Sequence, residues 1–139
     1  MDEIETYLEE HQQLKAMMAE LDRLVAADSP PDSLSFLRFR HNFGLRLTEH
    51  LNHEDWLIYP RLRASHLPEL RAVADRHAAG MDAISTAFSG HRAYWTSEKI
   101  AAEWHRYRRA TTALLAALHH RIELEEAELY PLVARVTCH

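Results

Sequence analysis

Histidine and glutamate are the residues of this chain whose number and spacing could do chemistry. Eleven of the 139 residues are histidine, a share well above that of an average soluble protein. Glu54 follows His50 by four residues, and Glu125 follows His120 by five. Imidazole nitrogen and carboxylate oxygen together suit iron, manganese or zinc. The pattern therefore predicts a metal site, provided that the fold brings these side chains together.

The two halves of the sequence repeat the same order of residues. In each half a lone histidine is followed about forty residues later by a His and a Glu, and then by a Tyr-Pro pair. Two antiparallel helix pairs related by a pseudo-two-fold axis would collect four imidazoles and two carboxylates in one layer. This set suffices for two metal ions if each Glu bridges them. The predicted ligands are His11, His50, Glu54, His77, His120 and Glu125.

Amphipathic helices are predicted to position these residues. Apolar side chains recur at helical spacing in four segments. With only 3 Gly and 5 Pro, the chain favours an all-α fold, an up-down-up-down four-helix bundle forming one domain over residues 1–139. A rise of about 1.5 Å per residue places His11, His50 and His77 at one height. The helices are expected over residues 3–26, from Ser33 to Tyr59-Pro60, from Pro68 to Ser89-Gly90, and from a cap at Thr96 or Ser97 to Tyr130-Pro131, with residues 89–97 as the longer loop.

Glu54 and Glu125 are the strongest indication of a metal site, because both fall on the apolar stripes of predicted helices. Burying a carboxylate without a partner costs several kcal/mol, so each calls for a cation. A single inward histidine is more often a hydrogen-bonded core residue than a ligand. Convergence of four histidines and two glutamates on one layer favours a metal. The alternative to a metal ion is an arginine that pairs with the buried carboxylates, and the candidates are Arg40, Arg61 and Arg121.

At these residues the chain resembles the hemerythrin-like family, also called the HHE cation-binding family. The resemblance runs from His11 to Pro131 and includes the segment His50-Leu-Asn-His-Glu54. It implies a four-helix bundle that holds a non-haem di-iron centre and binds or senses dioxygen. It also implies that two carboxylates bridge the irons. The likeness assigns His11 and His50 to one iron, His77 and His120 to the other, and Glu54 and Glu125 to the bridges.

The fourth helix departs from the repeat. Aligning Pro131 with Pro60 places Glu125 on Glu54 but Arg121 on His50, so His120 lies one residue early. Some members of the family have this five-residue spacing, and a local widening of the helix would absorb the extra residue. His120 is therefore the expected ligand. A regular helical wheel presents His119 instead, which remains the rival.

The third helix also departs from the oxygen carriers, which have a fifth histidine one turn from His77. Val73 and Met81 occupy those positions here. One iron would be a ligand short, so exogenous ligands such as water, peroxide or nitric oxide are favoured. The absence of the fifth histidine therefore favours a function in sensing, iron handling or peroxide chemistry over reversible oxygen carriage.

Three functions are consistent with these residues. The first is a di-iron protein that binds or senses dioxygen, nitric oxide or peroxide, with manganese or zinc as alternative metals. The second is an enzyme that uses the same centre to disproportionate peroxide or oxidise iron. The third is a histidine phosphotransfer bundle, which leaves the inward Glu54 and Glu125 unexplained.

Composition excludes several other classes. Lys and Arg total 16 against 21 Asp and Glu, a formal charge of −5, which disfavours nucleic acid and anionic membranes as partners. The acidic N-terminus does not resemble a signal peptide, and the longest uncharged run is too short to cross a bilayer. The single Cys138 cannot form an intrachain disulfide. A cytoplasmic protein is expected.

Overall fold

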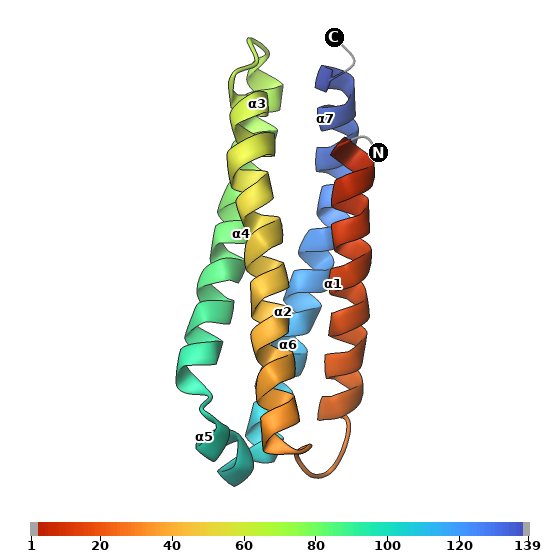
Figure 1. Ribbon diagram of the computed structural model, residues 1–139. Helices are drawn as coiled ribbons and strands as arrows, with labels where there is room; N and C mark the ends of the chain where they lie inside the picture. The colour runs from red at the N-terminus through yellow and green to blue at the C-terminus, as the bar shows by residue number, and fades with distance from the viewer. Residues whose placement is uncertain (1–2, 138–139) are drawn as a thin grey trace.

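The protein is a bundle of four antiparallel helical columns, seen in a computed structural model that describes residues 3–137 (Figure 1). Successive columns run in opposite directions, which confirms the predicted all-α, up-down-up-down architecture. The columns are α1 (Glu3–Val25); α2 (Ser33–His53), η1 (Glu54–Ile58) and α3 (Tyr59–Arg63); α4 (Pro68–Tyr94); and α6 (Trp104–Leu124), η2 (Glu125–Leu129) and α7 (Tyr130–Thr137), with the short α5 (Ser97–Ala102) between α4 and α6.

The helix boundaries follow local capping chemistry in most places. The Asp32 carboxylate accepts a hydrogen bond from the Ser35 backbone N–H at 3.0 Å, so α2 begins where it was expected. Thr96 caps a helix in the same way, but that helix is the short α5, and the long α6 begins only at Trp104.

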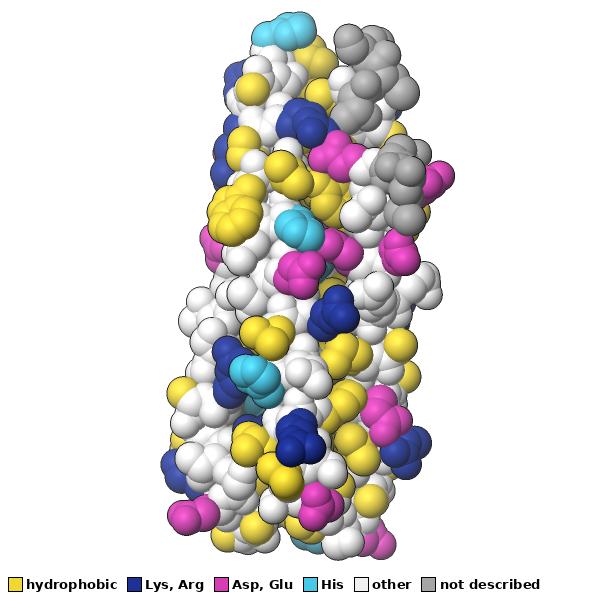
Figure 2. Space-filling view, viewed as in Figure 1, with side chains coloured by type: hydrophobic (Ala, Val, Ile, Leu, Met, Phe, Trp, Pro, Cys, Tyr) yellow, Lys and Arg dark blue, Asp and Glu magenta, His cyan; other side chains and the backbone are white. Residues whose placement is uncertain are grey.

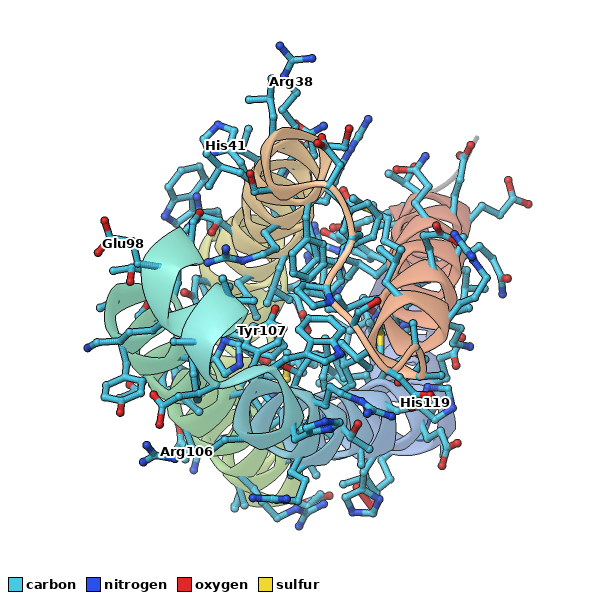
Figure 3. All side chains as sticks on the ribbon, turned by 90° about the horizontal axis from the view of Figure 1, so that it is seen from below. Arg38, His41, Glu98, Arg106, Tyr107 and His119 are labelled. Carbon is cyan, nitrogen blue, oxygen red and sulfur yellow. The ribbon has the colours of Figure 1, made fainter. Side chains whose placement is uncertain are left out.

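The prediction that Ser89-Gly90 ends the third helix is wrong, because α4 continues to Tyr94. Gly90 has no positive φ, and a helical glycine costs only about 1 kcal/mol relative to alanine. Packing beyond it supports the extra turn: the Trp95 side chain is buried, and the His91 ring lies 5.4 Å from that of Tyr107. In the view along the bundle, Tyr107 lies among the helices while Arg38, His41 and Arg106 point outward (Figure 3).

Two apolar clusters divide the interior along its length. The larger one includes Leu14, Leu47 and Ile122, and the smaller one includes Tyr7, Ile58 and Leu129. Each column passes from one cluster to the other. His11, His50, Glu54 and Glu125 lie between the two clusters along their columns, and His77 lies beside Ala74 and Ala78 of the smaller one. The fold therefore encloses one polar layer within an apolar interior.

The outer surface is mixed in charge. On the face shown in Figure 2, Lys and Arg side chains are scattered among acidic and apolar ones and form no continuous basic area. Within residues 3–137, no helix combines the length and apolar character that crossing a membrane requires.

Candidate metal centre

Five of the six predicted ligands lie buried in the polar layer. They come from all four columns: His11 from α1, His50 from α2, His77 from α4, and Glu54 and Glu125 from the first positions of η1 and η2. Their exposed fractions are 0 to 1%. This burial agrees with the predicted convergence of imidazoles and carboxylates on one level of the bundle.

Three of these side chains, His11, His50 and Glu125, meet with the spacing of metal ligands, and Glu54 adjoins them through His50. His11 Nε2 lies 3.0 Å from His50 Nε2 and 2.9 Å from Glu125 Oε1. His50 Nε2 lies 2.8 Å from Glu54 Oε1 and 3.5 Å from Glu125 Oε1. Two atoms at right angles around a metal, each about 2.1 Å from it, are about 3.0 Å apart. The observed separations match the edges of such a coordination shell.

One oxygen of this cluster also lacks a partner. Glu125 Oε2 is buried and receives no hydrogen bond from any residue that the structure describes. A buried carboxylate oxygen without a donor is costly, and a bound cation removes that cost. The donor set and the uncompensated oxygen therefore fit one metal ion held by His11, His50, Glu54 and Glu125.

Outer carboxylates lie behind both imidazoles, and the one behind His50 orients that ring toward the cluster. His50 Nδ1–H donates a hydrogen bond of 2.8 Å to Glu10 Oε1, which turns the Nε2 side of the ring inward. The other oxygen of Glu10 lies 2.5 Å from His53 Nδ1. On the opposite side, Glu126 Oε1 lies 3.6 Å from His11 Nδ1, and Lys15 holds Glu126. A carboxylate behind each ligating histidine is the usual way to fix its tautomer and ring orientation.

Each glutamate of the cluster begins a π-helical turn. In η1 and η2 the backbone N–H of the tyrosine bonds the carbonyl of the glutamate five residues earlier, Tyr59 to Glu54 and Tyr130 to Glu125. Widened turns of this kind occur often at functional sites. They aim both tyrosines at the centre: the Tyr59 hydroxyl donates to Glu54 Oε2 at 3.4 Å, and the Tyr130 hydroxyl lies 2.8 Å from His11 Nε2.

Burial and mutual repulsion perturb the titration of the cluster. Burial, aided by the Glu125 carboxylate, raises the pKa of Glu54 to about 8. Burial and the neighbouring His50 lower the pKa of His11 to about 4. Burial also disfavours the cationic form of His50, but the surrounding carboxylates outweigh it and raise its pKa well above the usual value. The metal-free cluster therefore retains protons that a metal ion would displace.

His77 is buried in the layer, but both of its ring nitrogens have other partners. Nε2 lies 3.2 Å from Glu128 Oε1, and Nδ1 lies 3.4 Å from Arg121 Nη2. Burial, together with the positive charge of Arg121, lowers the pKa of His77. The sequence had proposed Arg40, Arg61 and Arg121 as candidate partners for the buried acids. Among the described residues none of the three pairs with Glu54 or Glu125: Arg121 contacts His77, Arg40 bonds the Trp95 carbonyl, and Arg61 pairs with Glu3.

The structure does not bring His120 to the cluster. His120 and the rival His119 are both exposed on α6, and the His119 side chain pairs with Glu123 instead. The predicted widening between His120 and Glu125 is wrong, because α6 stays α-helical to Leu124 and the π turn follows Glu125. A regular helix places Arg121, four residues before Glu125, on the inward side.

Several residues of the site were not identified from the sequence. The two tyrosines were visible in the repeat, where each precedes a proline, but they had been given no role. Glu10 and Glu126 had no signal of their own, since acidic residues adjoining a ligand on a helix usually belong to its solvated face. Their function follows only from the helix packing that sets each behind an imidazole.

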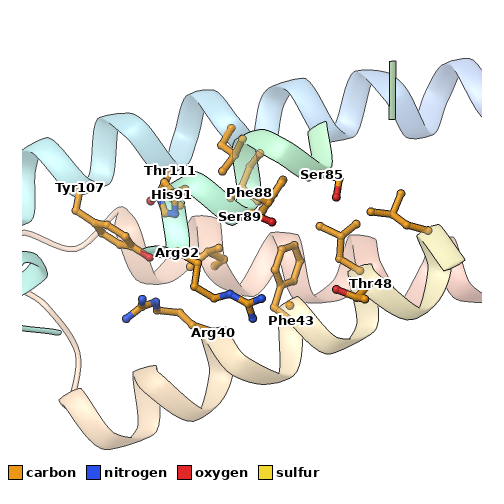
Figure 4. Close-up of a pocket in the computed structure, with 16 residues that line it drawn as sticks. Arg40, Phe43, Thr48, Ser85, Phe88, Ser89, His91, Arg92, Tyr107 and Thr111 are labelled. Carbon is orange, nitrogen blue, oxygen red and sulfur yellow. Dashed lines mark hydrogen bonds between the residues drawn. The ribbon is translucent and has the colours of Figure 1, made fainter. Parts of the chain in front are cut away.

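A well-formed pocket lies away from the cluster, between α2, α4 and α6 (Figure 4). Arg40, Phe43 and Arg92 line it, together with His91, whose Nε2 lies 3.0 Å from the Thr111 hydroxyl. None of the predicted metal ligands lines this pocket. The donor geometry, and not the depth of a cavity, marks the cluster as a group that could hold a metal ion.

Comparison with known proteins agrees with this arrangement. A family model described as the hemerythrin HHE cation binding domain matches residues 2–133, nearly the whole chain. No curated protein and no solved structure matches it. Together with the four-column bundle and its buried His and Glu cluster, the match shows that the chain belongs to the hemerythrin HHE cation-binding family.

Proposed function

We propose that this protein holds non-haem iron between His11, His50, Glu54 and Glu125 and uses it to bind or sense dioxygen or a related small ligand such as nitric oxide or peroxide. The observation that carries the proposal is the convergence of His11 Nε2, His50 Nε2 and Glu125 Oε1 at separations of 2.9 to 3.5 Å, with Glu54 Oε1 2.8 Å from His50 Nε2. Iron is among the metals that such a mixed donor set prefers. When bound, it supplies coordination positions for a small ligand.

The protein contributes orientation and exclusion of water. Glu10 keeps the Nδ1 proton on His50, so that the Nε2 lone pair faces the metal position. The two apolar clusters close the layer on both sides and leave Glu54 and Glu125 fully buried. In this environment the charges of the carboxylates are weakly screened, which favours a divalent or trivalent cation.

A second candidate function is peroxide chemistry at the same centre. The observation that favours it is the Tyr130 hydroxyl, 2.8 Å from His11 Nε2. Burial and the nearby carboxylates keep its pKa well above the usual value, so the hydroxyl retains its proton at neutral pH. A buried hydroxyl that keeps its proton can donate a hydrogen bond to peroxide bound beside it, which favours this alternative.

Metal content and ligand binding together test the proposal. Protein expressed with ample iron should contain iron, and Glu125→Gln should lose most of it, whereas Glu123→Gln, which alters an exposed acid on the same column, should not. The anaerobic ferrous protein should change its optical spectrum on adding nitric oxide or dioxygen. Oxygen evolution from added peroxide would favour the enzymatic alternative. Iron content near zero in the unmodified protein would refute the proposal.

A further inference from the structure

Arg121 occupies the place of the fourth imidazole in the internal repeat. In the first half, His50 precedes Glu54 by four residues, and in the second half Arg121 precedes Glu125 by four. Both glutamates begin a π turn of five residues, so the two halves are in register in the structure as well as in the sequence. The side chain where the repeat would supply a metal ligand is therefore a guanidinium.

A guanidinium cannot replace an imidazole as a ligand. It carries N–H donors, has no lone pair to offer and stays charged at any physiological pH. Because Arg121 can only donate, its contact with His77 requires an unprotonated Nδ1, and the proton on Nε2 then faces Glu128. The single lone pair of the neutral His77 ring thus points at Arg121 and is unavailable to a metal ion.

The surface of α4 is shaped to accept this guanidinium. A Cβ atom built on Gly80 would lie 2.3 Å from Arg121 Cζ and 2.8 Å from its Nε. Those distances are far below van der Waals contact, so any residue larger than glycine would displace the arginine. Gly80 lies within α4, one turn after His77, at a position where a helix gains nothing in stability from glycine.

We propose that the centre of this chain is mononuclear, with one metal ion held by His11, His50, Glu54 and Glu125 and with Arg121 engaging the histidine that a second ion would need. The inference rests on the proposed metal binding, but it departs from the two irons that the family resemblance implies. Four donor side chains complete a site for one ion. The residues expected to complete a second site are His77, which is engaged by Arg121 and Glu128, and His120, which is exposed.

Metal stoichiometry at saturation tests the inference in three variants. The unmodified protein and His120→Ala should each bind one ion of iron or manganese per chain. Arg121→His should bind a second ion, because it removes the cation, frees His77 and supplies the missing imidazole. Arg121→Gln is the matched control, since it removes the charge without adding a ligand, and it should remain at one ion.

Electron paramagnetic resonance of the manganese-loaded protein gives an independent readout. One Mn²⁺ per chain should show the six-line spectrum of an isolated ion, whereas two ions about 3.5 to 4 Å apart would couple and broaden it. A count of two in the unmodified protein, or the loss of one ion in His120→Ala, would overturn the single-ion inference alone. A count near zero would overturn the proposed function with it. The unmodified protein and His120→Ala decide between one ion and two even if Arg121→His does not fold.

Discussion

Replacing Glu10 by glutamine should weaken metal binding although Glu10 does not touch the metal position. Its carboxylate accepts the Nδ1 proton of His50 at 2.8 Å and also holds His53. Removing an outer carboxylate of this kind typically lowers metal affinity about 10- to 100-fold. Glutamine keeps the size and one acceptor oxygen, so we expect a middle value of roughly 30-fold, equivalent to about 2 kcal/mol.

Glu9→Gln is the matched control for this substitution. It removes the same charge one residue earlier on α1, from an exposed position, where the loss of long-range attraction should change affinity less than about twofold. Competition against a chromophoric chelator, with zinc or cobalt as the probe, measures both variants on one scale. Equal losses in the two variants would show that net charge alone matters. An unchanged affinity in Glu10→Gln would refute the argument that this carboxylate orients His50.

Three further outcomes are expected. Metal affinity should rise at least tenfold per pH unit from pH 6 to 7.5, because the raised pKa values of Glu54 and His50 mean that binding must displace protons. Calorimetry in buffers of different ionisation enthalpy measures the number of protons released. Burial, aided by a nearby arginine, lowers the pKa of His91 to about 4. Below pH 6.5, His91 therefore binds a proton in the unfolded state but not in the folded state. The free energy of unfolding falls as pH decreases from 6.5 towards 4, by about 2 kcal/mol at pH 5. His91→Gln should lack this acid-dependent loss in urea titrations, and a parallel loss would refute the assignment. Leu118→Ala should cost about 2–5 kcal/mol in urea unfolding because Leu118 is fully buried, whereas Leu34→Ala, at a position 55% exposed, should cost much less.

The helical columns could be predicted because the apolar pattern and the capping residues act locally. Leu14, Met18 and Leu21 recur at helical spacing, and the structure buries all three. The end of α4 could not be predicted, since Gly90 is only a weak helix breaker and the packing of His91 and Trp95 comes from other columns. Where a local preference is worth about 1 kcal/mol, tertiary contacts decide the boundary.

The sequence by itself determined which buried groups need a cation. His11, His50, Glu54 and Glu125 fall on apolar stripes, and a carboxylate on such a stripe must find a counter-charge wherever the helices pack. The helical spacing and the position of each residue along its helix place these residues at one height in the bundle, because the rise per residue of a helix is regular.

Only the tertiary structure decided which side chain of the fourth column faces that layer. His119, His120 and Arg121 are consecutive, so a rotation of about 100° per residue chooses among them, and sequence spacing alone cannot settle the phase of a helix that widens somewhere along its length. The widening falls after Glu125 instead of before it. Gly80, on a different column, leaves the space that Arg121 fills. The inward residue is thus selected by packing between columns, which no local pattern contains.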